Sequence, residues 1–216
     1  MPKDLCEKSF LCKLFAHYFV SLHPFSKQIA DLMGEQTNDI AQELALLHTL
    51  SGADYARQVE RIAQRKEFRP VIGEPAVFTV GGEKGEDYDN LQCAAQRAVE
   101  HGHRVFILPN PKGTRSADLI LEKKGVFKLY DVKTIQGKSS VGTRLQDSIG
   151  QANRVLLNMR ADYNARLLAS DIKAYFESNS YALEILIFKG HKAIIVNRRL
   201  TQNDMFNRLF RKMYEK

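Results

Sequence analysis

The chain contains 216 residues, of which 44% are hydrophobic and 26% are charged, and its formal net charge is +7. This composition is ordinary for a globular protein that buries a core of its own, and it excludes a low-complexity chain. No apolar run is long enough to cross a bilayer, because charged residues or histidines interrupt even the stretch 10–25. The excess of lysine and arginine favours a polyanionic partner.

Three cysteines, Cys6, Cys12 and Cys93, are odd in number and lack any paired spacing. We interpret them as reduced thiols that act as small hydrophobic side chains, and not as a disulfide framework or a zinc site. The first residues also lack the apolar core and the small-residue cleavage site of a signal peptide. The chain is therefore expected to fold in a reducing compartment, although a piece of a larger secreted protein would start in the same way.

Residues 3–67 show helical spacing, and we expect helices before Pro24, over about 26–50 and over about 53–66. In the last of these helices an arginine recurs at every fourth position, at Arg57, Arg61 and Arg65. The simplest interpretation of this basic stripe is a solvated helix face, and the alternative is a contact with nucleic acid or a partner.

A joint rich in proline and glycine follows, at Pro70, Gly73 and Pro75. The predicted domains are therefore a helical segment over 1–70 and a second domain over 71–216. In the second domain we expect a strand at 76–80, a helix over about 90–101, a strand at 104–108, a hairpin of strands 116–121 and 127–133, a helix over 145–159, a hairpin of strands 183–188 and 192–196, and a last helix capped by Thr201. This order predicts an α/β fold with a mixed sheet.

Two carboxylates and one lysine converge on the hairpin of strands 116–121 and 127–133. Asp131 and Lys133 are two residues apart on a strand and therefore share a face, and a turn at Gly125 returns Asp131 to the neighbourhood of Asp118. Charged groups on strands that are otherwise apolar cost free energy to bury, so we expect them to have a function.

Converging carboxylates with no histidine or cysteine beside them favour a hard divalent cation such as Mg²⁺ or Mn²⁺. A cation held by Asp118 and Asp131 would bind a phosphodiester oxygen and lower the pKa of a bound water. Lys133 is expected to orient or activate that water or to stabilise the phosphate, and the main-chain carbonyl of Val132 is a further candidate ligand. The residues therefore predict hydrolysis of a phosphodiester.

The same residues resemble the PD-(D/E)xK nuclease superfamily, whose pattern is matched by Asp118 and by Asp131-Val132-Lys133 between two helices, with Ala117 in place of the usual proline. Residues 89–158 are also similar to the C-terminal toxin nucleases of contact-dependent growth inhibition. The likeness lies in an alanine-rich helix and in three short segments, Gly102-His103-Arg104-Val105, Leu108-Pro109 and Gln151-Ala152-Asn153-Arg154-Val155-Leu156.

This resemblance implies a restriction-endonuclease-like mixed sheet flanked by helices, here preceded by the all-helical segment 1–70. It implies an endonuclease that depends on Mg²⁺ or Mn²⁺, with Zn²⁺ as an alternative, and that cleaves tRNA or DNA. It also implies an immunity protein as partner and the cytoplasm of a target cell as the place of action. The helical segment would then serve entry into that cell or binding of a partner.

Relatives of this kind often carry a glutamate in the first helix of the domain, where this chain has Asn90 and Leu91. Asp89 is the nearest substitute as a third metal ligand. Gln151 lies away from the apolar stripe of the helix expected over 145–159, so we expect it to reach the metal site, with a plain surface position as the alternative. The candidate phosphate contacts around the site are Lys112, Arg115, Lys138, Arg144 and Arg154.

Several alternatives stay open at this point. A housekeeping or mobile-element nuclease of the same fold would serve repair, restriction or junction resolution, and a non-catalytic module would bind nucleic acid with no cleavage. Asp131 and Lys133 would be a simple charge pair if the hairpin lay exposed at a sheet edge. A metal-independent ribonuclease would need His101 or His103 at the site.

Overall fold

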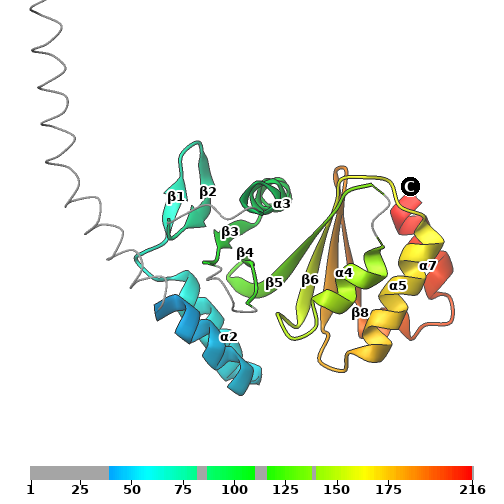
Figure 1. Cartoon of the computed structure of the whole chain (residues 1–216), viewed down its shortest axis with the longest axis horizontal. Coiled ribbons are helices and arrows are strands. Elements are labelled where there is room, and N and C mark those ends of the chain that lie inside the picture. The colour runs from blue at the N-terminus through cyan, green and yellow to red at the C-terminus, as the bar shows by residue number, and fades with distance from the viewer. Residues whose placement is uncertain (1–38, 82–86, 110–115, 138–139, 216) are drawn as a thin grey trace, which may run out of the picture.

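The computed structural model describes residues 39–81, 87–109, 116–137 and 140–215. The helix predicted before Pro24 lies outside these residues. The described chain forms one eight-stranded sheet in which the strands follow each other in chain order from β1 to β8 (Figure 1). The predicted α/β class with a mixed sheet is thus confirmed. No described helix is long and apolar enough to cross a membrane.

The sheet contains both parallel and antiparallel pairs. Its strands are β1 (Arg69–Val71), β2 (Glu74–Thr79), β3 (Arg104–Ile107), β4 (Leu119–Lys123), β5 (Val126–Ile135), β6 (Arg154–Met159), β7 (Glu184–Lys189) and β8 (Lys192–Asn197). The pairs β2–β3, β5–β6 and β6–β7 are parallel, and the other four pairs are antiparallel.

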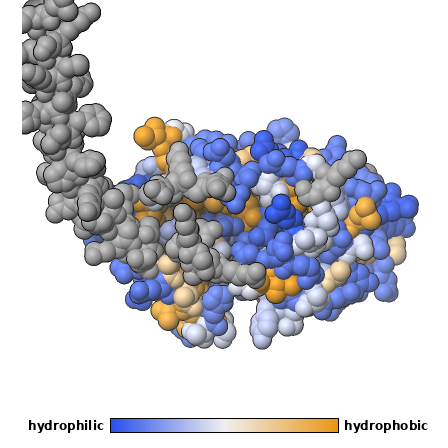
Figure 2. All heavy atoms as spheres, in the orientation of Figure 1, coloured by the Kyte–Doolittle hydropathy of each residue, from blue (hydrophilic) through white to orange (hydrophobic). Residues whose placement is uncertain are grey.

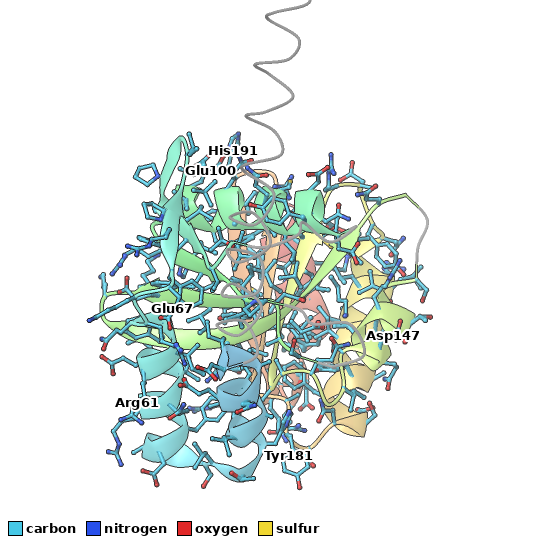
Figure 3. All side chains as sticks on the ribbon, turned by 60° about the vertical axis from the view of Figure 1, so that its left-hand side comes forward. Arg61, Glu67, Glu100, Asp147, Tyr181 and His191 are labelled. Atoms are coloured by element: carbon cyan, nitrogen blue, oxygen red, sulfur yellow. The ribbon has the colours of Figure 1, made fainter. Side chains whose placement is uncertain are left out.

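Each parallel pair is joined by a crossover that contains a helix, as parallel strands require. These helices are α3 (Tyr88–Glu100), α4 (Val141–Asp147) and α5 (Ala165–Ser178). The sheet is preceded by a helix over 39–46, by η1 (Leu47–Thr49) and by α2 (Gly52–Ala63), and it is followed by α6 (Arg198–Thr201) and α7 (Phe206–Glu215). In Figure 3, Arg61 of α2 and Tyr181 before β7 lie toward one end of the view, whereas Glu100 of α3 and His191 after β7 lie toward the other.

The helix expected over 145–159 is wrong. The helix α4 ends at Asp147, Gly150 has a φ of 86°, and residues 154–159 form β6 in the middle of the sheet. Val155 and Leu156 are both fully buried, because helices cover both faces of this strand. A run of apolar residues that is buried on both sides has no alternation, so its spacing also fits a helix.

Further elements differ from the expectation, and one of them is β1, which forms inside the predicted joint. The helix α5 is absent from the predicted elements. Thr201 does not cap the last helix, because it ends α6, where its hydroxyl donates a hydrogen bond to the carbonyl of Arg198 at 2.8 Å. The last helix, α7, begins five residues later at Phe206.

One face of the sheet packs against α3, and the other face is divided between two groups of helices. On the first face, alanines of α3 form one buried cluster with side chains from β2 to β7, among them Val77, Val105, Leu119, Leu156 and Phe188. On the second face, one half of the sheet packs against α2 and residues 40–47, through Phe106, Ile120 and Leu129. The other half packs against α4, α5 and α7, through Ile135, Val155 and Ile185 (Figure 1).

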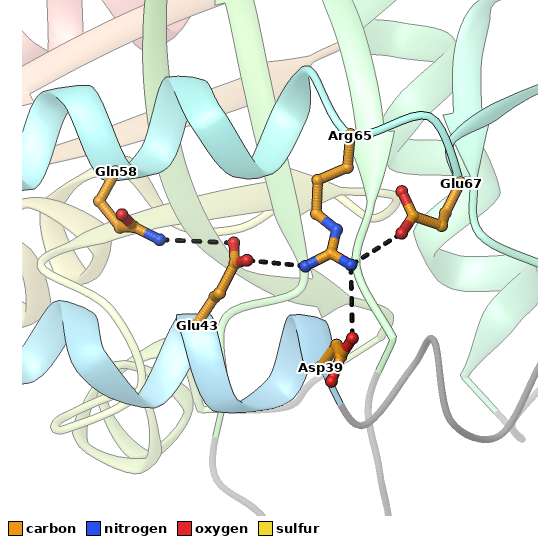
Figure 4. Close-up of polar contacts among 5 residues, drawn as sticks. All are labelled: Asp39, Glu43, Gln58, Arg65 and Glu67. Carbon is orange, nitrogen blue, oxygen red and sulfur yellow. Dashed lines mark hydrogen bonds and ion pairs between the residues drawn. The ribbon is translucent and has the colours of Figure 1, made fainter.

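The first helices are tied together by Arg65, just after α2. Its guanidinium donates hydrogen bonds to Glu43 and Glu67, each at 2.7 Å, and lies 3.8 Å from Asp39 (Figure 4). Gln58 donates a further hydrogen bond to Glu43 at 3.4 Å. Arg65 is therefore a structural clamp, whereas Arg57 and Arg61 are exposed as expected. The helices share a core with the sheet, and the division at residue 70 stays a prediction.

Candidate metal and catalytic site

The hairpin of β4 and β5 places two carboxylates opposite each other. The strands turn through Lys124 and Gly125, which have φ values of 55° and 78°, as a two-residue hairpin turn requires. Leu119 pairs with Tyr130, and the N–H of Asp118 donates to the carbonyl of Tyr130 at 3.0 Å. Asp118 therefore lies opposite Asp131, and opposite residues of an antiparallel pair share a face. The proximity expected from the sequence is observed.

Three short contacts hold these groups. The Nζ of Lys133 donates to Oδ1 of Asp131 at 3.0 Å and lies 3.0 Å from Oδ2 of the same carboxylate. The N–H of Val132 donates to Oδ2 of Asp118 at 2.7 Å. The Asp131 side chain is 0% exposed and that of Lys133 is 15% exposed, so the pair is not a charge pair on an exposed edge.

The site lies at the boundary between the two apolar clusters of the second face. Asp131 stands between Leu129, which packs against α2, and Ile135, which packs against α4 and α5. Asp131 and Lys133 therefore lie between the part of this face that α2 covers and the part that α4 and α5 cover. On α5, burial raises the pKa of the Tyr175 hydroxyl, and the charge of Asp131 raises it further.

Burial makes the ionised carboxylates unstable. Burial is the main cause that raises the pKa of Asp131 to about 8, and repulsion from Asp118 adds to it, while Lys133 opposes it. Burial also raises the pKa of Asp118, although the Val132 N–H and Lys133 favour its charged form. The two acids are close enough to share a proton.

These groups fit a divalent cation. Two buried carboxylates that repel each other supply the oxygen ligands that Mg²⁺ or Mn²⁺ prefers. The N–H and carbonyl of a strand residue point to the same edge, so the Val132 carbonyl also faces the Asp118 side. Within the described parts of the chain no group of three histidine, cysteine or acidic side chains forms a metal site.

One further acid that the sequence did not single out acts electrostatically on Asp118. Asp87, directly before α3, repels the Asp118 carboxylate and contributes to its raised pKa. Asp89, the expected substitute, is exposed in the first turn of α3. Asn90 accepts a hydrogen bond from Gln136 at 3.0 Å, just after β5. The start of α3 thus lies beside the hairpin. In the sequence, Asp87 could have been found as an acid at the N-cap position of that helix.

The structure does not bring every predicted residue to the carboxylates. Gln151 lies in the turn after α4, where its amide donates to the carbonyl of Asp147 at 2.7 Å. Arg144 is exposed on α4. The roles of both at the site stay predictions. Three predicted phosphate contacts lie outside the described residues: Lys112, Arg115 and Lys138.

Arg154 begins β6 directly before Val155, which pairs with Asp131, so the Arg154 side chain is on the sheet face opposite to Asp131. Its Nε is 4.0 Å from Glu184, which also pairs with Lys128 at 2.8 Å and accepts a hydrogen bond from the Tyr130 hydroxyl. Arg154 therefore belongs to a network between strands, away from the carboxylate pair. The histidine alternative is not favoured either, because His101 stacks on Phe188 on the α3 face.

Comparison with known proteins adds little to this description. No family model and no curated protein matches the chain. Among solved structures, a chain of the CdiA-CT/CdiI toxin and immunity complex from Burkholderia pseudomallei is similar over 55% of this chain and 98% of its own length. The sequence identity is 13% and the TM-score is 0.36, which is too low to assign a family or an activity.

Proposed function

We propose that this chain is a metal-dependent endonuclease that hydrolyses phosphodiester bonds of tRNA or DNA. The observation that carries the proposal is the buried pair of Asp118 and Asp131, with the Nζ of Lys133 3.0 Å from the Asp131 carboxylate. An arrangement that costs free energy when empty is best explained by a ligand of opposite charge. The resemblance of Asp118 and Asp131-Val132-Lys133 to the PD-(D/E)xK pattern supports the same reading.

The residues divide the work among them. Asp118 and Asp131, with the Val132 carbonyl, would hold Mg²⁺ or Mn²⁺, which when bound polarises a phosphoryl oxygen and lowers the pKa of water. The Val132 N–H fixes one oxygen of Asp118, so the other oxygen keeps its direction. Lys133 is held at the mouth of the site by Asp131, where its ammonium orients the attacking water or stabilises the charge that develops on the phosphate. Asp87 joins Asp89 as a candidate third acid, and both are exposed at the start of α3.

The test is a cleavage assay with total tRNA and with plasmid DNA, in Mg²⁺, Mn²⁺, Zn²⁺ or EDTA. We expect cleavage of one polymer in Mg²⁺ or Mn²⁺ and none in EDTA. Asp131→Asn should lower the rate at least about 100-fold, because the Asp131 carboxylate would hold the cation that stabilises the charge developing during the reaction. Asp147→Asn, which changes an exposed acid on α4, is the matched control and keeps the rate. Binding of nucleic acid with no cleavage in any metal would instead identify a non-catalytic module.

We further propose that the enzyme is a toxin domain that acts in the cytoplasm of a target cell and is neutralised by an immunity protein. This part is supported by the sequence likeness over residues 89–158. Production of the chain inside bacterial cells is expected to arrest growth, and Asp131→Asn is expected to abolish the arrest. Growth restored by the product of a small acidic reading frame directly downstream would support the toxin, and unimpaired growth with active enzyme would favour a housekeeping or mobile-element nuclease.

A further inference from the structure

A basic groove lies between α7 and the start of α5, apart from the carboxylate pair. It has a volume of about 560 Å³ and is lined by Arg166, Asn207, Arg208, Arg211, Lys212 and Glu215. A second hollow of about 340 Å³ shares Arg166, Arg211 and Glu215 with it and adds Lys189 and Asp162. None of the nucleic-acid contacts predicted from the sequence lies in these hollows.

Most of the positive charge in the groove is not neutralised by the protein. Arg211 pairs with Glu215 at 3.3 Å, and Lys189 pairs with Asp162 at 3.3 Å. Arg166, Arg208 and Lys212 are exposed, and within the described residues no acid lies within ion-pair distance of them. Arg208 and Lys212 are one helical turn apart on α7, so their side chains point the same way.

The start of α5 adds to the positive potential. This helix has 14 residues, no acid in its first turn and Arg166 as its second residue. Asn164 caps it, accepting hydrogen bonds from the N–H groups of Arg166 and Leu167 at 2.9 and 3.2 Å. A helix N-terminus carries a partial positive charge, and the first turn of α5 contains no acidic side chain that would offset it.

The lining of the groove favours phosphate groups over a protein surface. Its arginine, lysine and asparagine side chains are types that contact phosphates. The one acidic side chain in the lining, Glu215, pairs with Arg211. The exposed apolar residues of α7, Leu209 and Met213, lie on the opposite flank of the helix at 100° per residue. The core of a protein interface needs apolar anchors, which the groove lacks. Figure 2 shows that the end of the molecule formed by α5 and α7 is largely hydrophilic on this face.

We infer that this groove binds the phosphate backbone of a nucleic acid, with Arg166, Arg208 and Lys212 as the contacts. The proposed function identifies the polymer, but binding at the groove requires neither a cation nor Asp131. Phosphate contacts carry no sequence information, so the groove would position the polymer on the protein and leave the choice of the cleaved bond to the carboxylate site.

The test measures the affinity of the full chain for tRNA and for duplex DNA in EDTA, across a series of salt concentrations. All proteins carry Asp131→Asn so that no strand is cut. The logarithm of the binding constant falls with the logarithm of the salt concentration, and we expect Arg208→Gln with Lys212→Gln to make this slope shallower by roughly 1.8. The same double variant is expected to bind at least about tenfold more weakly at about 0.1 M salt. Arg61→Gln with Lys66→Gln removes the same charge at the end of α2, on the other side of the molecule (Figure 1), and is expected to leave both quantities close to those of the parent.

The outcomes separate this inference from the proposed function. Equal losses in the two double variants would show a general charge effect and would overturn the groove as a site. An unchanged affinity in the double variant of Arg208 and Lys212 would also overturn the groove as a site for nucleic acid. The alternative would then be that Arg208 and Lys212 bind an acidic protein. If the α7 variant loses affinity while the parent with Asp131 never cleaves, the groove stands and the nuclease does not.

Discussion

Replacing Asp131 with asparagine is expected to stabilise the metal-free protein above neutral pH. In the folded chain the pKa of Asp131 is raised to about 8, mainly by burial, whereas in the unfolded chain it is near its ordinary value of 3.8. The folded state therefore holds a proton that the unfolded state releases between these two pH values. The stability is full below about pH 4 and is lost as the pH rises toward 8.

The size of the effect follows from the same shift. At about 1.36 kcal/mol per pKa unit, the shift of Asp131 from 3.8 to about 8 sets an upper limit of roughly 6 kcal/mol. Relaxation and entry of water around a buried charge lower this amount, so we expect a loss of about 2–4 kcal/mol. Asparagine keeps the shape and carries no charge, and it should be insensitive to pH at this position.

The assay is urea unfolding in EDTA at pH 6.5, 7.5 and 8.5, for the parent, Asp131→Asn and Asp147→Asn. This window lies above the titration of His103, whose pKa burial lowers to about 4. We expect the free energy of unfolding to fall with pH in the parent and in Asp147→Asn, and to stay nearly constant in Asp131→Asn. A parent whose stability does not fall across this window, or a variant that is less stable than the parent at pH 8.5, would refute the reasoning about the buried pair.

Three further predictions concern the clamp, a histidine and the cation. Arg65→Met should cost about 2–3 kcal/mol of unfolding free energy in urea, because it removes the ion pairs of the partly buried Glu43 and Glu67. Arg57→Met removes an ion pair whose side chains are 72% and 68% exposed, so it should cost less than about 0.5 kcal/mol. Equal costs in the two variants would contradict the clamp. The parent should lose stability as the pH falls from about 6.5 to 4, because the unfolded state takes up a proton on His103 first, and His103→Gln should make this loss smaller. Calorimetric melting across that range measures the loss, and an equal loss in the parent and the variant would contradict the prediction. Mg²⁺ at 100 times its dissociation constant should raise the unfolding free energy by about 2.7 kcal/mol in the parent and leave Asp131→Asn unchanged.

The hairpin could be predicted from the sequence because its signals are local. Residues two apart on a strand share a face, and Gly125 supplies the positive φ that a two-residue turn needs, so Asp118, Asp131 and Lys133 follow from spacing alone. The depth of the site did not follow, because it depends on α2 and α4 meeting on either side of Asp131. The role of Arg65 as a clamp also depends on residues 22 positions away.

The region after the hairpin was harder to predict for two different reasons. Val155-Leu156-Leu157 lies between two strands with both faces covered, and its apolar run fits a helix and a central strand equally well. For α5 the signal was present, since Asn164 is a good cap and Leu168, Ile172 and Tyr175 recur at helical spacing. Arg154 was predicted on a helix, but it lies on the strand β6. Because side chains alternate along a strand, its guanidinium lies on the sheet face opposite to Asp131.

The most direct test of the central claim is calorimetric titration of Mn²⁺ into the parent protein and into Asp118→Asn and Asp131→Asn, at pH 8. The carboxylate pair as a metal site predicts saturable binding in the parent, with protons released because the raised pKa of Asp131 must be overcome, and at least about tenfold weaker binding in each variant. The absence of saturable binding in the parent, or equal binding in all three proteins, would contradict it.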